Sequence, residues 1–213
     1  MEKRIIAITG PSGVGKSTLA EKLLEFENLV IPFHCTTRSR RSDDIEGLYR
    51  YLTHEEYSGL LKENRFLLSS GDGPIVLKEY GNFYGVLKED CLPLWEKNYI
   101  TILFVSYKDI NSLVNLTKQG IEIDIINLRF SDIYNGVSTR LINDKRRNHT
   151  KDEINRRVAS ALDDEEKYGS IVETYAKCVV YTDILDIKQT YEKVCFDLRI
   201  NDKPKKLIKK INR

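Results

Sequence analysis

The stretch ITGPSGVGKSTLAEKL, residues 8–23, decides the fold of this chain. Its glycines and its Lys-Ser pair match the spacing G-x-x-x-x-G-K-[ST] of a phosphate-binding loop. An apolar run over residues 4–9 precedes the loop, and an amphipathic helical pattern begins at Lys16. The motif requires a strand before it and a helix after it, so the context predicts a site for a polyphosphate.

Each residue type in this loop has a physical reason to be there. Glycines allow the left-handed backbone that turns successive N–H groups toward an anion, and the helix that follows points its positive end at the same anion. Lys16 is expected to bridge the β- and γ-phosphates and to act in catalysis, while the Ser17 hydroxyl ligates Mg²⁺. The expected ATP-binding residues are Gly10, Ser12, Gly13, Gly15, Lys16, Ser17 and Thr18.

Outward from the loop, apolar runs of strand length alternate with helical patterns along the chain. This alternation is typical of an α/β fold in which helices cover a parallel sheet. Five strands are predicted, at residues 4–9, 28–33, 100–106, 123–130 and 178–182. Helices are predicted at about 16–26, 109–118, 132–143, 152–168 and 184–197.

The polar, Arg- and Tyr-rich stretch from about residue 34 to 90 interrupts the alternation. It predicts an inserted lobe with short strands and one helix, for which Thr53 and Glu56 have capping-box spacing. We expect one domain over residues 1–200, with a core of 1–33 and 91–200, the lobe at about 34–90, and a lid at about 143–153. Residues 201–213 form a basic tail.

Composition excludes several classes of protein. The 213 residues carry a net charge of +2, but the last thirteen hold six Lys/Arg and one Asp, which leaves residues 1–200 mildly acidic. That balance argues against a nucleic-acid partner. No apolar run approaches the roughly 20 residues of a membrane span, and the N-terminus has no signal-type segment. We therefore expect a cytoplasmic protein, monomeric or homodimeric, whose four scattered cysteines are reduced thiols.

The absence of an N-K-x-D motif argues against a GTPase, and a small kinase fits the chain better. Such an enzyme needs a second site for its acceptor and an arginine-bearing lid that excludes water. A candidate acceptor site is the cluster Arg38, Arg40 and Arg41, which follows the pair Thr36-Thr37. Guanidinium groups suit bidentate binding of a phosphate monoester.

With these residues in view, the chain resembles the guanylate kinase family. The acceptor lobe of that family carries T-T-R-x-x-R-x-x-E-x-x-G-x-x-Y and then G-N-Y-Y-G. Here Asp44 replaces the glutamate, Tyr49 comes one residue early, and residues 81–85 read GNFYG. The resemblance covers about 160 residues of the chain and includes the phosphate-binding loop and the lid.

The resemblance implies roles for particular residues. The acceptor phosphate would be held by Arg38, Arg41, Tyr49 and Tyr84, with Asp44 and His34 also counted as substrate-binding residues. The lid arginines Arg140, Arg146 (or its neighbour Arg147) and Arg157 would act on the transferring phosphoryl group. His34 stands where the family has a serine, and its imidazole either contacts the acceptor or only orients the backbone.

This chain departs from the family where guanine is read. The family uses that serine and two carboxylates, whereas this chain has His34, Leu68, and Phe104 with Ser106. A site without those acceptors loses discrimination for guanine. An insertion at residues 69–80 contains Asp72 and Glu79, either of which could restore a carboxylate.

Three functions follow from these observations. The first is an ATP-dependent nucleoside monophosphate kinase acting on GMP, dGMP or another base. The second is a kinase of a non-nucleotide phosphate such as ribose 1,5-bisphosphate, and the third is a guanylate-kinase-like module that only binds proteins. Retention of Lys16, Ser17 and the lid arginines favours an enzyme with a small phosphomonoester acceptor over a module.

Overall fold

A computed structural model describes residues 3–41, 44, 46–69, 82–145 and 147–200 of the chain. The predicted lid residue Arg146, the possible carboxylates Asp72 and Glu79, and the basic tail lie outside these ranges. Among the described helices, none is both long enough and apolar enough to cross a membrane.

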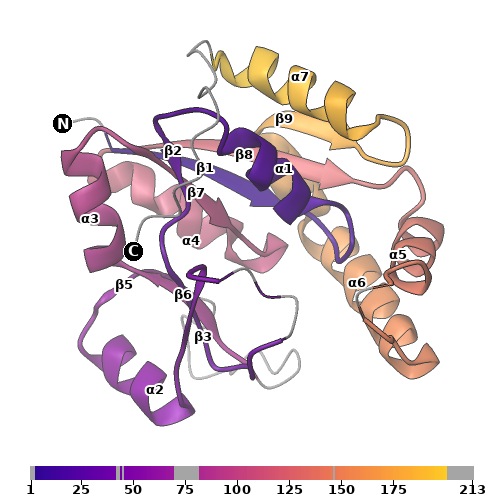
Figure 1. The fold of residues 1–213 in the computed structure, drawn as a ribbon, viewed down its shortest axis with the longest axis horizontal. Helices are drawn as coiled ribbons and strands as arrows, with labels where there is room; N and C mark the ends of the chain where they lie inside the picture. Colours follow the sequence, from indigo (N-terminus) through magenta and orange to yellow (C-terminus); the bar gives the residue numbers. More distant parts are fainter. Residues whose placement is uncertain (1–2, 42–43, 45, 70–81, 146, 201–213) are drawn as a thin grey trace.

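A five-stranded parallel sheet forms the centre of the molecule, as the alternating pattern predicts (Figure 1). Its middle strand, which leads into the phosphate-binding loop, is fully buried from Ile5 to Ile8. β-Branched side chains of this kind pack well on a pleated surface that is covered on both faces. In spatial order the strands are β2 (Leu29–Val30), β7 (Ile100–Phe104), β1 (Lys3–Thr9), β8 (Ile121–Arg129) and β9 (Ala176–Tyr181).

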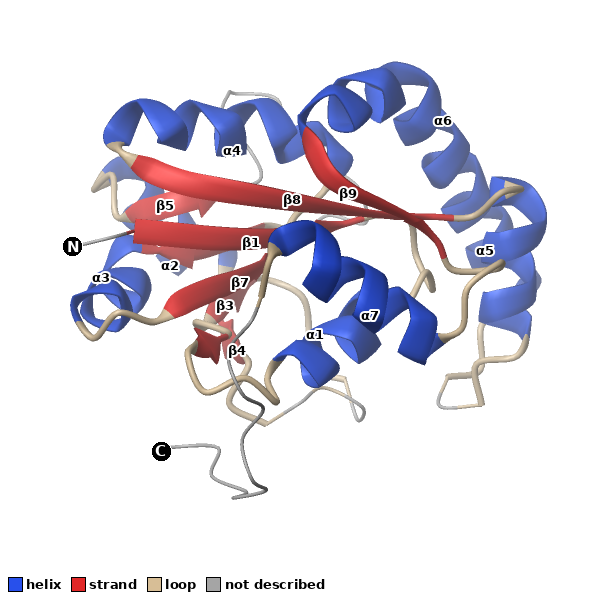
Figure 2. Cartoon of the chain, turned by 90° about the horizontal axis from the view of Figure 1, so that it is seen from above, coloured by secondary structure: helices blue, strands red, loops and turns tan. Residues whose placement is uncertain are grey.

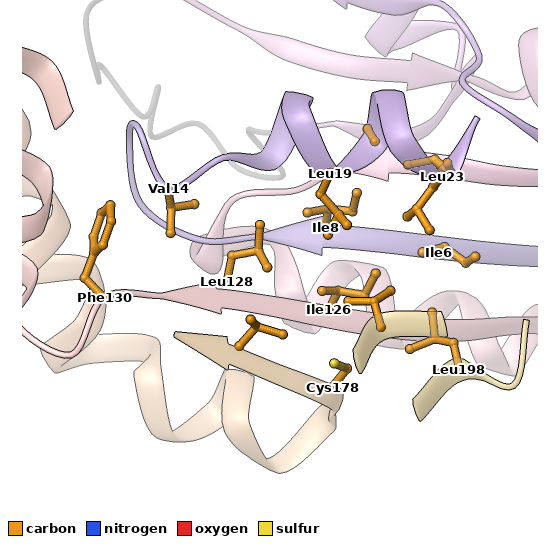
Figure 3. Close-up of a cluster of buried hydrophobic side chains, with 14 of the residues drawn as sticks. Ile6, Ile8, Val14, Leu19, Leu23, Ile126, Leu128, Phe130, Cys178 and Leu198 are labelled. Atoms are coloured by element: carbon orange, nitrogen blue, oxygen red, sulfur yellow. The ribbon is translucent and has the colours of Figure 1, made fainter. Parts of the chain in front are cut away.

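Helices cover both faces of this sheet (Figure 2). On one face lie α1 (Lys16–Leu23) and α7 (Ile187–Leu198), and on the other lie α4 (Ile110–Asn115) and the long α6 (Lys151–Tyr175). The helix α5 (Ile133–Ile142) packs beside α6. Figure 3 shows Ile6 and Ile8 of β1 meeting Leu19 and Leu23 of α1 in one of the two large apolar clusters.

The inserted lobe has its own four-stranded sheet, in the spatial order β4 (Tyr49–Tyr51), β3 (His34–Thr36), β6 (Tyr84–Leu87) and β5 (Phe66–Ser69). One helix, α2 (His54–Lys62), packs on it through the buried Tyr57. Its predicted capping box is confirmed, since Thr53 and Glu56 bond to each other's backbone N–H groups.

The largest differences from the predicted elements are at β2, α6 and α3. β2 has two residues where the apolar run 28–33 predicts six, and α6 continues to Tyr175, well past the predicted end at 168. A helix absent from the predictions, α3 (Lys88–Glu96), contains Pro93, a residue that normally interrupts helices. Burial of Cys91 and Trp95 stabilises α3, and the expected lobe boundary at residue 90 falls inside it.

Candidate active site

A cavity of about 500 Å³ opens between the core sheet, the lobe and α6. Its lining comes from the phosphate-binding loop, from the end of β7 with the short 3-10 helix η1 (Tyr107–Asp109), from the lobe, and from one face of α6. In Figure 1 the lobe and α6 lie on either side of this region, below the sheet. The carboxyl ends of parallel strands are the usual place for ligands in such sheets.

The phosphate-binding loop has the backbone that its motif predicts. Gly10, Gly13 and Gly15 have φ values of 139°, 76° and 102°, and a Cβ at Gly10 would overlap the carbonyl oxygen of Leu128. The Lys16 ammonium donates to the carbonyl oxygens of residues 10 and 11, at 2.6 and 2.9 Å. The remaining predicted nucleotide-binding residues Ser12, Ser17 and Thr18 complete the loop and the start of α1, where Ser17 and Thr18 are exposed.

Two of the predicted catalytic residues meet in the cavity. Lys16 and Arg157 both line it, and the guanidinium of Arg157 also lies 3.5 Å from the Ser12 hydroxyl and 2.7 Å from the Glu153 carboxylate. Burial, and then the charge of Arg157, lower the pKa of Lys16 to about 8. Arg157 therefore extends from α6 to the loop that would hold the donor phosphates.

Arg140 lies beside the phosphate-binding loop but outside the cavity lining. Its Cβ lies against Gly13, but its guanidinium donates to the carbonyl oxygen of Thr182 at 3.1 Å and is not part of the cavity lining. The sequence analysis missed Arg156, which directly precedes Arg157 on α6 and lines the cavity.

Arg38 and Asp44 bind each other rather than facing the cavity. Two hydrogen bonds of 2.6 Å join them, and Asp44 also accepts from the Tyr51 hydroxyl at 2.6 Å and from the Arg41 N–H at 2.8 Å. Although burial opposes the shift, these hydrogen bonds hold the pKa of Asp44 well below its usual range. Both side chains are nearly buried, at 6% and 5% exposure, and neither belongs to the cavity lining, so their roles in substrate binding stay predictions.

Three other predicted phosphate-binding residues, Arg41, Tyr49 and Tyr84, do line the cavity. Behind them, the guanidinium carbon of Arg38 lies 4.6 Å from the centre of the Tyr49 ring and supports that ring. Burial, and then the charge of Arg38, lower the pKa of Arg41. Such crowding of cations in a partly desolvated place attracts an anion.

The structure decides between the two interpretations of His34. Its Nε2 accepts from the N–H of Phe104 at 3.2 Å, so its Nδ1 donates to the carbonyl oxygen of Pro32 at 3.0 Å. Burial lowers the pKa of His34 to about 4, which keeps the ring neutral. Both ring nitrogens have backbone partners, so His34 lines the cavity as a backbone-orienting residue.

Another part of the cavity wall consists of the residues that stand where the family has its guanine-reading carboxylates. Leu68, Phe104 and Ser106 all line it, and Leu68 packs in the same apolar cluster as Val105. The Ser106 hydroxyl accepts from the N–H of Lys108 at 3.3 Å and so caps η1. None of these three positions supplies a carboxylate, and Leu68 and Phe104 make this part of the wall apolar.

Several lining residues escaped the sequence analysis. Lys108 and Asp109 of η1 line the far end of the cavity, two helical turns along α6 from Arg157, together with Asp164 and Glu165 of α6. The α6 residues had a detectable signal, because positions three and four apart share a helix face and Asp164 follows Arg157 by two turns. Nothing local marks η1, whose place in the cavity depends on where β7 ends.

Comparisons with known proteins identify the same family as the sequence motifs. The family model described as guanylate kinase matches residues 2–197. A guanylate kinase of Clostridium tetani is 32% identical over 142 residues, which cover 66% of this chain and 65% of that protein. A guanylate kinase of Mycoplasma mobile is 30% identical over 74% of this chain and 77% of its own length. The crystal structure of guanylate kinase from Anaplasma phagocytophilum superposes with a TM-score of 0.65 at 20% identity, over 93% of this chain and 86% of that one, which shows the shared fold. The chain belongs to the guanylate kinase family.

Proposed function

We propose that this protein transfers the γ-phosphoryl group of ATP to a nucleoside 5′-monophosphate of the GMP type. One observation carries the proposal: cations from three elements line a single cavity. Lys16 comes from the loop and Arg157 from α6, while Arg41 comes from the lobe together with the hydroxyls of Tyr49 and Tyr84. Two anionic phosphates brought into this space would have their charge neutralised from both sides.

The donor end would be bound by the loop. Its inward-turned N–H groups and the N-terminus of α1 suit the β- and γ-phosphates, and the Lys16 ammonium would exchange its two carbonyl partners for phosphate oxygens. Mg²⁺ would be held by those phosphates and by the exposed hydroxyl of Ser17, and it would withdraw charge from the transferring group. Among the described residues no group of three or more His, Cys, Asp or Glu forms a separate metal cage, which suits a metal carried on phosphates and water.

The acceptor end would be aligned by the lobe. Arg41, Tyr49 and Tyr84 would fix the acceptor phosphate, and Arg157 would lie between the two reacting phosphates. Phosphoryl transfer needs little covalent assistance, so alignment and charge neutralisation supply most of the rate enhancement.

The far end of the cavity favours a nucleoside over a sugar bisphosphate. Among the described residues there, Lys108 already pairs with Asp164 and Glu165 with Arg129, and Asp109 adds a further carboxylate, so a second phosphate would meet carboxylates and cations that are already engaged. An uncharged base would instead lie against Leu68 and the neighbouring apolar side chains. The names of the relatives, all guanylate kinases, support GMP as the first acceptor to test.

The test is a coupled ADP-release assay with ATP and, side by side, GMP, dGMP, AMP, CMP, UMP and ribose 1,5-bisphosphate. Lys16→Ala should lower transfer by roughly a hundredfold or more, because it removes the loop's cation from the transferring group. Its melting temperature should stay close to that of the unchanged protein.

Lys22→Ala is the matched control, since Lys22 lies on the same helix, is half exposed and pairs with Glu25 on the surface. It should keep full activity. Near-normal turnover in Lys16→Ala, or no ADP release with any of the six acceptors, would refute the proposed function.

A further inference from the structure

The far end of the cavity holds an ion pair that the proposed phosphate chemistry does not use. The Lys108 ammonium lies 3.2 Å from a carboxylate oxygen of Asp164, with side-chain exposures of 12% and 19%. Lys108 belongs to η1, directly after β7, and Asp164 belongs to α6, two turns beyond Arg157. The pair therefore joins two walls of the cavity at the end away from the phosphate-binding loop.

The position of this pair separates it from the neighbouring surface ion pair of α6. One residue earlier on the helix, Asp163 pairs with Lys167 at 2.6 Å, but those side chains are 48% and 58% exposed and lie outside the cavity lining. Lys108 and Asp164 instead share the lining with Ala161 and the apolar residues of the β7 end. A partly desolvated pair facing a binding cavity is placed to meet the ligand.

The chemistry of the pair suits one edge of a base. An ammonium group only donates hydrogen bonds, and a carboxylate only accepts them. A carbonyl next to a ring N–H presents the complementary acceptor and donor side by side, as the O6 and N1–H of guanine and hypoxanthine do. Adenine presents the opposite order, with a donor at position 6 and an acceptor at position 1.

The residues beside the pair determine which other groups of the base can be recognised. The 2-amino group of guanine needs an acceptor of its own, and the two family positions that would supply a carboxylate wall are occupied here by Leu68 and by Phe104 with Ser106. The Ser106 hydroxyl already accepts from the η1 backbone. These positions therefore provide no carboxylate that distinguishes guanine from hypoxanthine.

We propose that Lys108 and Asp164 read the 6-oxo and N1–H edge of the acceptor base. The acceptors are then the 6-oxopurine nucleoside 5′-monophosphates, GMP, dGMP and IMP alike, and the 2-amino group is left unread. This assignment rests on the proposed function and names the substrate class of the same site.

The experiment measures kcat/KM for GMP, IMP and AMP in the unchanged protein, in Lys108→Met and in Asp164→Asn. The unchanged protein should use GMP and IMP within about fivefold of each other and AMP at least about a hundredfold less well, as expected where a polar site meets the wrong hydrogen-bonding edge. Each variant should lose roughly ten- to hundredfold with GMP and IMP, mainly through KM, which is the scale of one charged hydrogen bond. ATP affinity and melting temperature should stay unchanged, because the pair lies away from the loop.

Asp163→Asn is the matched control and should behave like the unchanged protein. Because the two residues act as a unit, the double variant should lose less than the product of the two single losses. Calorimetric binding of GMP and IMP to the same variants tests base reading independently of turnover.

Three outcomes would overturn the assignment. AMP used as well as GMP, or Lys108→Met behaving like Asp163→Asn, would show that the pair reads nothing. If the protein prefers GMP over IMP by more than about a hundredfold, and Asp109→Asn abolishes this preference, then Asp109 and not the pair recognises the base. If the proposed function is wrong, no monophosphate will support ADP release. If the base assignment is wrong as well, GMP and IMP will also fail to bind in the calorimetric experiment.

Discussion

At the scale of single residues, the arginines of the lobe show how neighbours in sequence acquire different tasks. Arg38 uses its guanidinium within the lobe, on Asp44 and against the Tyr49 ring, and so holds the wall of the cavity in place. Arg41 follows three residues later and lines the cavity. Arg40 is exposed on the surface. Only Arg41 is therefore placed to touch the acceptor directly.

We predict that Arg41→Gln lowers kcat/KM for the acceptor by about 1.5–3 kcal/mol in transition-state free energy, the value of a hydrogen bond to a charged group. ATP affinity should hardly change, because Arg41 belongs to the lobe and not to the phosphate-binding loop. The measurements are acceptor kinetics at saturating ATP and an ATP binding titration. Arg40→Gln is the matched control with the same chemistry on an exposed side chain. Equal losses for the two substrates, or equal losses in the two variants, would contradict this role for Arg41.

At the scale of elements, the helix α5 is held against the core by a glycine. A Cβ at Gly136 would overlap the ring of Phe130, which is 2% exposed and belongs to the core cluster. The Asp132 side chain caps the helix by accepting from the Asn135 N–H at 2.9 Å. The close approach of α5 to Phe130 places Arg140 beside the phosphate-binding loop.

We predict that Gly136→Ala destabilises the protein by about 1–3 kcal/mol, because the added methyl group overpacks a filled core. Gly59→Ala in α2 is the opposite control, since no atom lies within 4 Å of a Cβ there. That variant should gain up to about 1 kcal/mol from better helix propensity. Urea unfolding of both variants measures the difference. A shift of the same sign in both would show that contact with Phe130 does not decide the effect.

At the scale of the whole molecule, the lobe sheet and the core sheet are joined beside the cavity by His34. The ring stands on β3 and accepts a hydrogen bond from Phe104 at the end of β7. It is buried and neutral, with its pKa lowered by burial to about 4. Protonation would place an uncompensated charge at the junction and remove that hydrogen bond. This connection between lobe and core therefore depends on an uncharged imidazole.

This gives a pH dependence with a definite sign. His34 binds a proton near pH 6.5 when unfolded and only near pH 4 when folded, so its contribution to stability is present above 6.5 and is lost as the pH falls toward 4. The loss should be about 3 kcal/mol when complete. Urea unfolding at pH 7.5 and 4.5 should show a smaller fall for His34→Gln than for the unchanged protein. His54→Gln, an exposed ring on α2, is the control, and parallel falls in all three proteins would contradict the prediction.

Local sequence was sufficient for much of the fold. The loop motif, the apolar runs and the capping box depend on residues close together in the chain, and they predicted the five parallel strands, the phosphate-binding backbone and the start of α2. Hydrophobic periodicity and glycine conformations are local properties, so they can be read without knowing the fold. Membership of the guanylate kinase family followed from the same motifs and is confirmed by the family match.

Tertiary structure decided the rest, because the remaining features depend on contacts between distant residues. Burial of Trp95 sustains α3 in spite of Pro93, and a carboxylate six residues away turns Arg38 from the cavity. The imidazole of His34 receives its second partner from a strand 70 residues along the chain. The far end of the cavity exists only where η1 meets α6, which brings Lys108 to Asp164. The sequence by itself determined a loop whose backbone suits a phosphate group, and the three-dimensional fold determined which side chains line the rest of the cavity.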